Sequence, residues 1–545
     1  MSNIFDVGSS ALNSLQRAIS TTGNNIANAN TDGYSRQEVE FASRTPNRIG
    51  GVTLGTGVEV SSIQRAYDQF LTQDVQARTS SSGYYSLYST TAEQIDNLMA
   101  DPATSISSAM DQFFASMEAV ANSPTSQPER QVMLSEAGTL ATRFNYVDAR
   151  LSELAENMNE QMDVFVLDIN QHTQDIAQLN QQISRLERTP GGSPNDLLDQ
   201  RDRAIESLSK LVRVETRQQD DGSMNVFTSS GHRLVSQSGA ETLRLSSAPQ
   251  PDGPVRLYLS APGGADTEIT GISLGGELGG AMDVSKNVID RARRDIGLLA
   301  VGLTETFNTQ HKAGDTLNQV AGAEFFSSIT PVATAAPLNS GTTTVSAVID
   351  DATKLTGASY QIDYTDSVVT ITNLTTNASQ EINGTSASLD GLTFTVSPFS
   401  NQTDGDRFLV EPTGRAASSM AVAITDTSDI AAANSGGNVG DNRNVLSLIG
   451  LREANTLKDG TQSVYDIYNN AVSQVAVDTR SARANADTEL SLLQSVNDRR
   501  DSITGVNLEE EAANLIRYQQ AYQAAAQIVT TANDVFDTLL RATSR

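Results

Sequence analysis

Two heptad repeats of apolar residues, one near each end of the chain, constrain the fold more than any other feature. The N-terminal repeat consists of Phe5, Leu12, Leu15, Ile19 and Ile26. The C-terminal repeat consists of Leu508, Leu515, Tyr518, Tyr522, Val529, Phe536 and Leu539. Steps of three and four residues place each set on one narrow helical face, which another helix must cover. We predict that the two ends pair as a coiled-coil-like inner domain, with these side chains as its assembly interface.

Turn and cap signals bound the two terminal helices. The first should end near Asn28 to Asn30, just ahead of a turn at Asp32-Gly33. Residues 48–65 then alternate around glycines and indicate a β-hairpin. The second helix should run over 507–541, starting with a capping box led by Asn507. The helices enter from opposite chain ends, so an intramolecular pair would be antiparallel.

Helical periodicity also fills most of the middle of the chain. The longest stretch keeps a three/four rhythm from Phe144 to Leu186. Further helices are predicted at 84–99, 105–121, 196–212, 283–310 and 462–500. Segments 213–275 and 330–412 differ, because short alternating runs there are separated by Gly, Asp and Asn. The predicted fold class is therefore mainly α with inserted β modules, a multi-domain α+β chain.

A chain of 545 residues is long enough for several domains. The patterns predict a terminal helical assembly domain (1–66 with 501–545), a helical rod domain (67–212 with 276–329 and 413–500), a first β-rich module (213–275) and a second, outer β-rich module (330–412).

Composition excludes several classes of function. There is no cysteine, which rules out disulfides, thiolate metal sites and thiol catalysis. The net charge of −28 repels phosphate backbones, so we expect no nucleic-acid partner. The N-terminus lacks the basic start and apolar core of a Sec-type signal peptide. No run approaches the roughly 18 apolar residues that a membrane span needs, so we expect no membrane insertion.

One polar cluster could suggest a metal or catalytic carboxylate site: Asn195, Asp196, Asp199 and Asp202, with Arg201 and Arg203. We interpret it as a helix start instead, with Asn195 as N-cap, acids in the first turn and an Asp199–Arg203 pair on a solvated face.

The histidines are equally uninformative about catalysis. His172, His232 and His311 lie in no catalytic motif, and His311 sits at a helix end where a cation is favoured. A hydrolase needs a nucleophile with a base, or a metal. We therefore predict no enzyme activity, no cofactor and no metal.

Several motifs point to one family. The run TTGNNIANANTDGYSRQ and the run VNLEEEAANLIRYQQAYQAAAQIVTTANDVFDTLL resemble the terminal signatures of flagellar axial proteins. Between them come, in order, SPNDLLDQRDRAIESLSKLV, GSMNVFTSSGHRLV, GGELGGAMD, FNTQHKAGD and GDNRN. That order resembles the family of flagellar hook-associated protein 1, over nearly the whole chain except about 330–412.

The resemblance implies a rod-like, extracellular subunit of the bacterial flagellum at the hook–filament junction, exported through the flagellar type III apparatus. It implies self-association into a ring or helical zone. The expected partners are the flagellar hook protein, a second hook–filament junction protein and a cytoplasmic export chaperone that binds the C-terminal region. A different hypothesis from the residues is a surface adhesin that displays segment 330–412 on a helical stalk.

Overall fold

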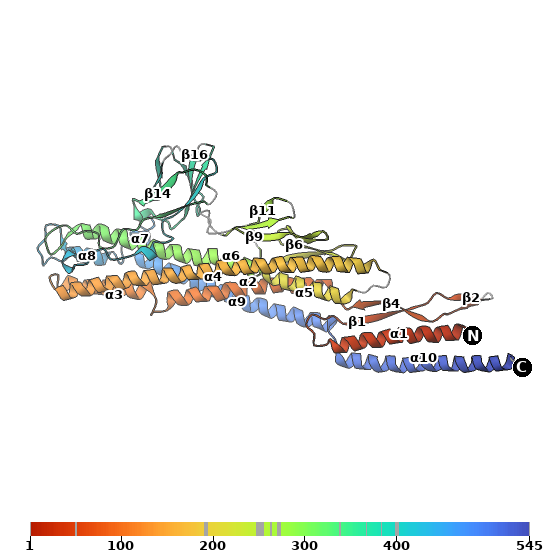
Figure 1. Cartoon of the computed structure of the whole chain (residues 1–545). Helices are drawn as coiled ribbons and strands as arrows, with labels where there is room; N and C mark the ends of the chain where they lie inside the picture. The colour runs from red at the N-terminus through yellow and green to blue at the C-terminus, as the bar shows by residue number, and fades with distance from the viewer. Residues whose placement is uncertain are drawn as a thin grey trace.

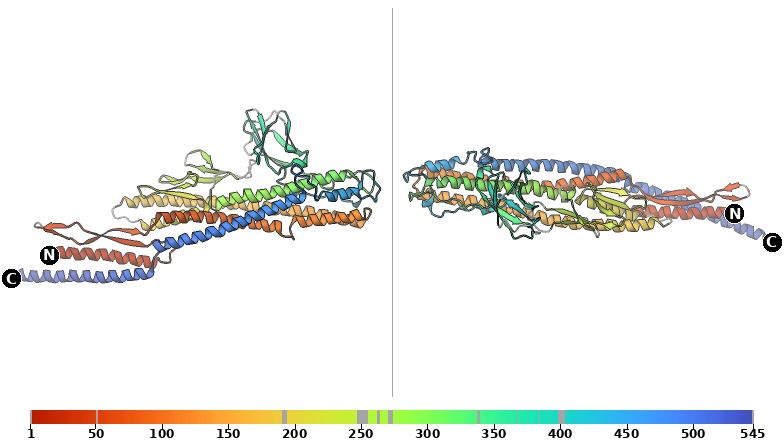
Figure 2. Two further views of the ribbon diagram at one scale, coloured as in Figure 1. Left: turned by 180° about the vertical axis from the view of Figure 1, so that it is seen from behind. Right: turned by 90° about the horizontal axis from the view of Figure 1, so that it is seen from above.

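The protein is an elongated helical rod, with a pair of terminal helices extending from one end and two β modules standing on one side (Figure 1; Figure 2). The computed structural model describes residues 2–49, 52–189, 194–246, 255–261, 264–269, 274–336, 339–366, 368–382, 384–397 and 403–543. Both chain termini lie together at the outer tip of the terminal helices (Figure 1). Within these ranges, no helix has the length and apolar character needed to cross a bilayer.

Long helices build the rod. They are α2 (Gln69–Ala100), α3 (Ile106–Asn122), α4 (Gln127–Glu187), α5 (Asn195–Leu211), α6 (Gly276–Val284), α7 (Asp290–Lys312), α8 (Arg443–Gly450) and α9 (Val464–Thr504). A π-helical turn, Ser285–Ile289, joins α6 to α7. α2 packs along α9, α5 and α6, while α4 packs on α3, α5 and α7. The predicted helical body is confirmed, although the short helices α6 and α8 were not predicted and α2 begins well before residue 84.

The longest helix, α4, contains 61 residues and is roughly 90 Å long at 1.5 Å per residue. It begins well before Phe144, where our prediction placed its start. Pro128 sits in its first turn, where the missing N–H costs no hydrogen bond. Arg130 interrupts the apolar rhythm, yet it is buried because its guanidinium donates to the carbonyls of Pro124 and Ile430.

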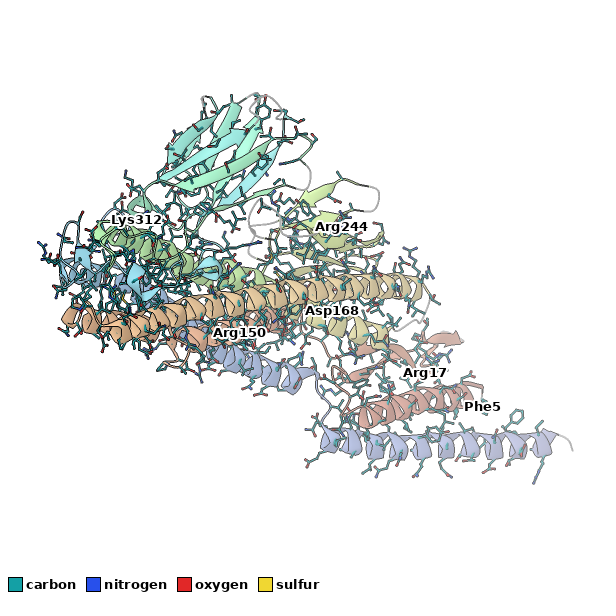
Figure 3. The ribbon with its side chains drawn as sticks, turned by 60° about the vertical axis from the view of Figure 1, so that its left-hand side comes forward. Phe5, Arg17, Arg150, Asp168, Arg244 and Lys312 are labelled. Atoms are coloured by element: carbon teal, nitrogen blue, oxygen red, sulfur yellow. The ribbon has the colours of Figure 1, made fainter. Side chains whose placement is uncertain are left out.

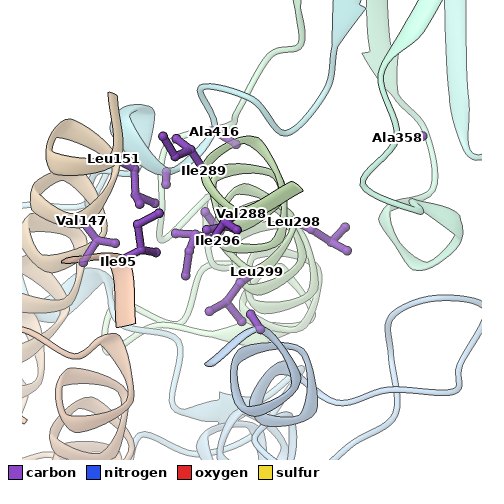
Figure 4. Close-up of a cluster of buried hydrophobic side chains, with 14 of the residues drawn as sticks. Ile95, Val147, Leu151, Val288, Ile289, Ile296, Leu298, Leu299, Ala358 and Ala416 are labelled. Carbon is purple, nitrogen blue, oxygen red and sulfur yellow. The ribbon is translucent and has the colours of Figure 1, made fainter. Parts of the chain in front are cut away.

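The rod core forms where α2, α4 and α7 meet. Ile95, Leu151 and Ile296 converge there and are fully buried (Figure 4). Towards the end of the rod away from the terminal helices the core becomes aromatic, with the rings of Phe113 and Phe307 5.5 Å apart. Burial of such side chains stabilises the bundle by about 1.5–3 kcal/mol each.

Both β segments form antiparallel sheets, as predicted. The first contains one sheet of β5 (Val214–Gln218), β6 (Met224–Thr228), β7 (Arg233–Ser236) and β8 (Gly239–Ala240), and another of β9 (Thr242–Leu245), β10 (Leu257–Ser260) and β11 (Asp266–Glu268). The second contains a sheet in the order β13 (Val332–Ala335), β20 (Arg407–Glu411), β15 (Tyr360–Thr365), β16 (Val368–Asn373), β17 (Ser379–Glu381), and a sheet in the order β14 (Thr344–Ile349), β19 (Leu392–Ser397), β18 (Ser386–Leu389).

The second β segment stands on one side of the rod (Figure 1) and touches it through the short turn 352–354, which packs on α7. Its first and last strands are paired, with Val332 opposite Glu411, so the chain enters and leaves at one place. Tyr360 and Phe394 join its two sheets at a ring distance of 5.2 Å. The segment therefore has its own core, and it meets the rod at its paired end strands and at the turn 352–354. Within the rod, the short strands β12 (Gly314–Asp315) and β21 (Ala433–Asn434) pair with each other.

The terminal region pairs α1 (Ser2–Ala27) with α10 (Leu508–Thr543). A ribbon of β1 (Gln37–Ser43) and β4 (Val58–Arg65) packs on α1, with β2 (Asn47–Ile49) and β3 (Val52–Leu54) at its tip. The predicted hairpin over 48–65 was too short. Its last strand, β4, pairs with β1, which lies before residue 48. The strand β1 was missed, although Val39 and Phe41 alternate there with Glu38 and Glu40.

Asp290 is a poorly solvated acid at the start of α7. Burial raises the pKa of its carboxyl to about 6, although Arg294 and Arg293 act in the opposite direction. Above that pH the folded protein must keep a carboxylate charge in a poorly solvated place.

Replacing Asp290 with Asn should therefore stabilise the protein at neutral pH and change little near pH 4. The folded state holds its proton more tightly than the unfolded chain, so the contribution of Asp290 to stability falls as pH rises from about 4 to about 6. We expect Asp290→Asn to raise the free energy of unfolding by about 1–3 kcal/mol at pH 7.5. Urea unfolding followed by circular dichroism at both pH values measures this, and an equal gain at both would contradict it.

Candidate assembly interface

The terminal helices α1 and α10 lie side by side and run antiparallel, as predicted (Figure 1). They approach each other closely. A Cβ atom at Gly8 would lie 2.6 Å from Cγ2 of Val529, which is too close for two carbon atoms that are not bonded to each other or to a common atom. On the facing helix Ala525 is buried. Small residues on both helices thus set the spacing of the pair.

The predicted apolar stripes are only partly covered within one chain. Half-buried members are Leu12, Leu15, Ile19, Ile26, Leu515, Tyr518 and Val529. Exposed members are Phe5 (46 %), Leu508 (51 %), Tyr522 (37 %), Phe536 (53 %) and Leu539 (41 %). Figure 3 shows side chains of α10 projecting from its outer side, with no other element of the chain beyond them. The pair leaves a long apolar surface in contact with water.

A second apolar face of α10 was not predicted. Ile528 and Val535 lie off the heptad stripe and are exposed, as is Ile4 on α1. Together with Ala524 and Ala532 they line an apolar groove of 430 Å³. The signal was the recurrence of apolar residues seven apart on a second helical face, among alanines that give it little hydrophobic weight. α10 is therefore apolar on more than one side.

The start of α10 is fixed by a cap and an ion pair. Asn507 Oδ1 accepts from the N–H of Glu509 at 3.0 Å, as the predicted capping role requires. The predicted capping box is incomplete, because the carboxylate of Glu510 binds Arg36 instead, at 3.1 Å.

Burial and nearby carboxylates raise the pKa of Tyr34 to about 12, so its hydroxyl stays protonated and donates to Asn25 Oδ1 at 2.9 Å.

The acids of α5 correct our interpretation of that helix. Asn195 is not its N-cap, since the side chain donates to the Ile63 carbonyl in the terminal region. Asp199 is buried, and it pairs with Arg65 rather than with Arg203. The predicted solvated face is in truth a contact between the rod and the terminal region. No sequence signal places Arg65 near this helix, because they are far apart along the chain.

The three histidines lie on different elements. His172 is half-buried on α4, and Nδ1 of His232 lies 2.9 Å from Ser230 Oγ in a surface turn. Burial lowers the pKa of His311, whose Nε2 accepts from the N–H of Ala431 at 2.9 Å. The expectation of a cation there is wrong, because the buried ring is neutral. Over the described part of the chain, no group of three acidic or histidine side chains has a metal-binding arrangement.

Comparisons with known proteins place these features in one family. The family model described as "Flagellar hook-associated protein FlgK helical domain" matches residues 92–326. The model "Flagellar hook-associated protein 1, D2-like domain" matches 335–412. The terminal helices match "Flagella basal body rod protein" over 5–34 and "Flagellar basal body rod FlgEFG protein C-terminal" over 500–542.

Full-length relatives decide the assignment. Flagellar hook-associated protein 1 of Escherichia coli is 34 % identical, and the alignment covers 99 % of this chain and 100 % of that protein. The chain belongs to the flagellar hook-associated protein 1 family. The member from Bacillus subtilis is 25 % identical over 97 % of this chain and 96 % of its own length.

A solved structure shares the fold. The flagellar hook junction protein FlgK from Burkholderia pseudomallei superimposes with a TM-score of 0.71 at 23 % identity, covering 79 % of this chain and 100 % of that chain.

The exposure along the terminal pair predicts a gradient of local stability. Almost every side chain of α10 beyond Ala532 is exposed, whereas both helices approach the rod at their other ends. Backbone amides in a helix without tertiary contacts exchange through local unfolding, which has a low free-energy cost there. In hydrogen exchange on the free protein, residues 533–543 should exchange fastest, 508–525 more slowly and 144–183 slowest. Uniform protection along α10 would contradict this order.

Proposed function

We propose that this chain is a structural subunit of the bacterial flagellum that forms the junction between hook and filament and has no catalytic activity. The exposed apolar faces of α1 and α10, at one end of a long rod, carry the proposal. Apolar surface removed from water gains about 25 cal/mol per Å². One antiparallel pair can cover only one side of each helix, so copies of the same pair are the natural cover for the other sides.

The partners follow from this arrangement and from the family. The chain self-associates into a ring or helical zone through the heptad residues described above. It contacts the flagellar hook protein on one side and a second hook–filament junction protein on the other. A cytoplasmic export chaperone binds the C-terminal region before export. The subunit acts outside the cell and leaves it without a Sec-type signal peptide.

The proposed division of labour follows the predicted domains. Residues 1–66 with 501–545 assemble, the helical rod spaces the outer parts, and 213–275 and 330–412 are attached modules. The boundary at 501 falls in the last turn of α9, which ends at Thr504. The match of 335–412 to a domain of the same family favours the junction subunit over the adhesin hypothesis.

A charge within the heptad stripe should block assembly. Leu515→Asp places a carboxylate on the face that α10 packs with, where burial without a partner costs several kcal/mol. We expect normal secretion and a normal rod but loss of filament attachment and motility. Electron microscopy of flagella and a swimming assay measure this. The matched control is Gln161→Asp, which adds the same charge at an exposed position on α4. Normal filament retention by Leu515→Asp would sink the idea.

The outer module should be dispensable for assembly. Replacing 332–411 with a short Gly/Ser linker removes a part that enters and leaves the rod at one place. We expect a folded, secreted protein that still joins hook to filament, judged by circular dichroism and by electron microscopy with a label on the protein. If the shortened protein is folded but cannot join the two, the module belongs to the assembly contact.

A further inference from the structure

The joint between the terminal region and the rod has few covalent links. The chain crosses from β4 into α2 at 66–68, and returns from α9 to α10 at 505–507. Between the two parts lies a polar cavity of 780 Å³, lined by residues of the 29–36 loop, α5 and the α9–α10 connection. Apolar packing does not fill this space. Polar contacts must therefore hold the terminal region at a defined angle.

One face of α5 supplies most of these contacts. Its side chains at positions 195, 196, 199, 202, 203 and 206 recur every three or four residues and so share a face. The hydrogen bonds to the terminal region include Asn195 Nδ2 to Ile63 O (2.9 Å), Gln37 Nε2 to Asp196 Oδ1 (3.0 Å), Ser35 N to Asp199 Oδ2 (3.1 Å) and Arg203 Nη1 to Asp32 O (2.8 Å).

A buried ion triad lies at the centre of this face. Arg65, the last residue of β4, donates through Nη1 to Asp199 at 2.8 Å and through Nη2 to Asp202 at 2.6 Å. The side chains are only 9 %, 3 % and 18 % exposed, respectively. A guanidinium fork binding two acids fixes both direction and distance. Breaking such a pair leaves a buried charge without its partner, which is strongly unfavourable.

α5 is itself held firmly by the rod. On its other side Arg201 is fully buried and donates to Asn180 Oδ1 of α4 at 3.1 Å and to Gly222 O at 2.7 Å. The loop on the terminal side is equally constrained. Gly33 has φ +67°, and a Cβ atom there would lie 2.6 Å from the side chain of Arg203. The contacts therefore join a helix that is anchored in the rod to a closely packed loop of the terminal region.

We propose that the polar face of α5 is a clasp that fixes the direction in which the terminal helices leave the rod, with Arg65 as its positioning residue. The clasp is a property of the single chain and does not depend on the proposed junction role. Because the clasp fixes this direction, any contact that holds the terminal helices in place also determines the orientation of the rod.

The absence of cysteine makes a direct test possible. Spin labels at Ser20→Cys on α1 and Gln181→Cys on α4, both exposed positions, report the distance across the joint by pulsed electron resonance. The full chain should give one narrow distance distribution. Asp199→Asn/Asp202→Asn, which removes the acids of the triad at nearly constant shape, should broaden it. Glu156→Gln/Glu160→Gln, the same change of charge on an exposed face of α4, should leave it narrow.

If the double variant does not fold, Arg65→Lys is measured in its place. It keeps the charge but cannot bond both acids through one planar fork, so the distribution should again broaden while circular dichroism is unchanged. A broad distribution in the parent protein overturns the proposal, and so does an unchanged narrow one in a folded triad variant. Loss of filament attachment with an unchanged distribution would count against the clasp and not against the junction role.

Discussion

The packing of α1 against α10 brings the two ends of a 545-residue chain together, and this closure constrains the path of the chain between them. Because both ends lie at one place, the chain between them must run out along the rod and come back. α2 leads away from the pair and α9 leads back, and these two helices pack along each other. The β modules are insertions in this path. The one at 332–411 closes on itself through paired first and last strands, so it leaves the path of the rod undisturbed.

The two kinds of contact in the molecule do different work. Inside the rod, apolar side chains such as Ile95, Leu151 and Ile296 are fully buried and supply cohesion without much directional preference. At the joint, charged and polar groups supply direction, because hydrogen bonds and guanidinium–carboxylate pairs have narrow geometry. Buried ion pairs contribute little net stability compared with apolar packing. Their concentration at the joint is therefore best explained by orientation rather than by strength.

The sequence predicted what periodicity encodes and missed what tertiary contact decides. The terminal helices, the long helix and the two β segments were predictable because apolar spacing follows burial along one element. The prediction missed the first turns of α4. Arg130 is buried there because it donates to a carbonyl far along the chain, that of Ile430, and the sequence does not reveal such a partner. The role of Asp199 was lost in the same way, since its partner Arg65 is 134 residues distant. A charge is normally expected on a solvated face, and only the fold shows where its partner lies.

The terminal pair also faces a conflict between assembly and solubility. If neighbouring copies cover these helices, as proposed above, each free copy must expose apolar side chains beforehand, and such patches promote unwanted association. The chain limits the patch by composition. Alanine and glutamine separate the large apolar residues in the first part of α10, so Tyr522 and Ile528 are exposed singly there. Near the end of the helix the exposed apolar residues lie together: Val535, Phe536, Leu539 and Leu540. A net charge of −28 adds repulsion between free copies. In the proposed assembly, weak contacts of this kind become stable only when many copies supply them together, so a single pair of molecules would gain little by meeting outside it.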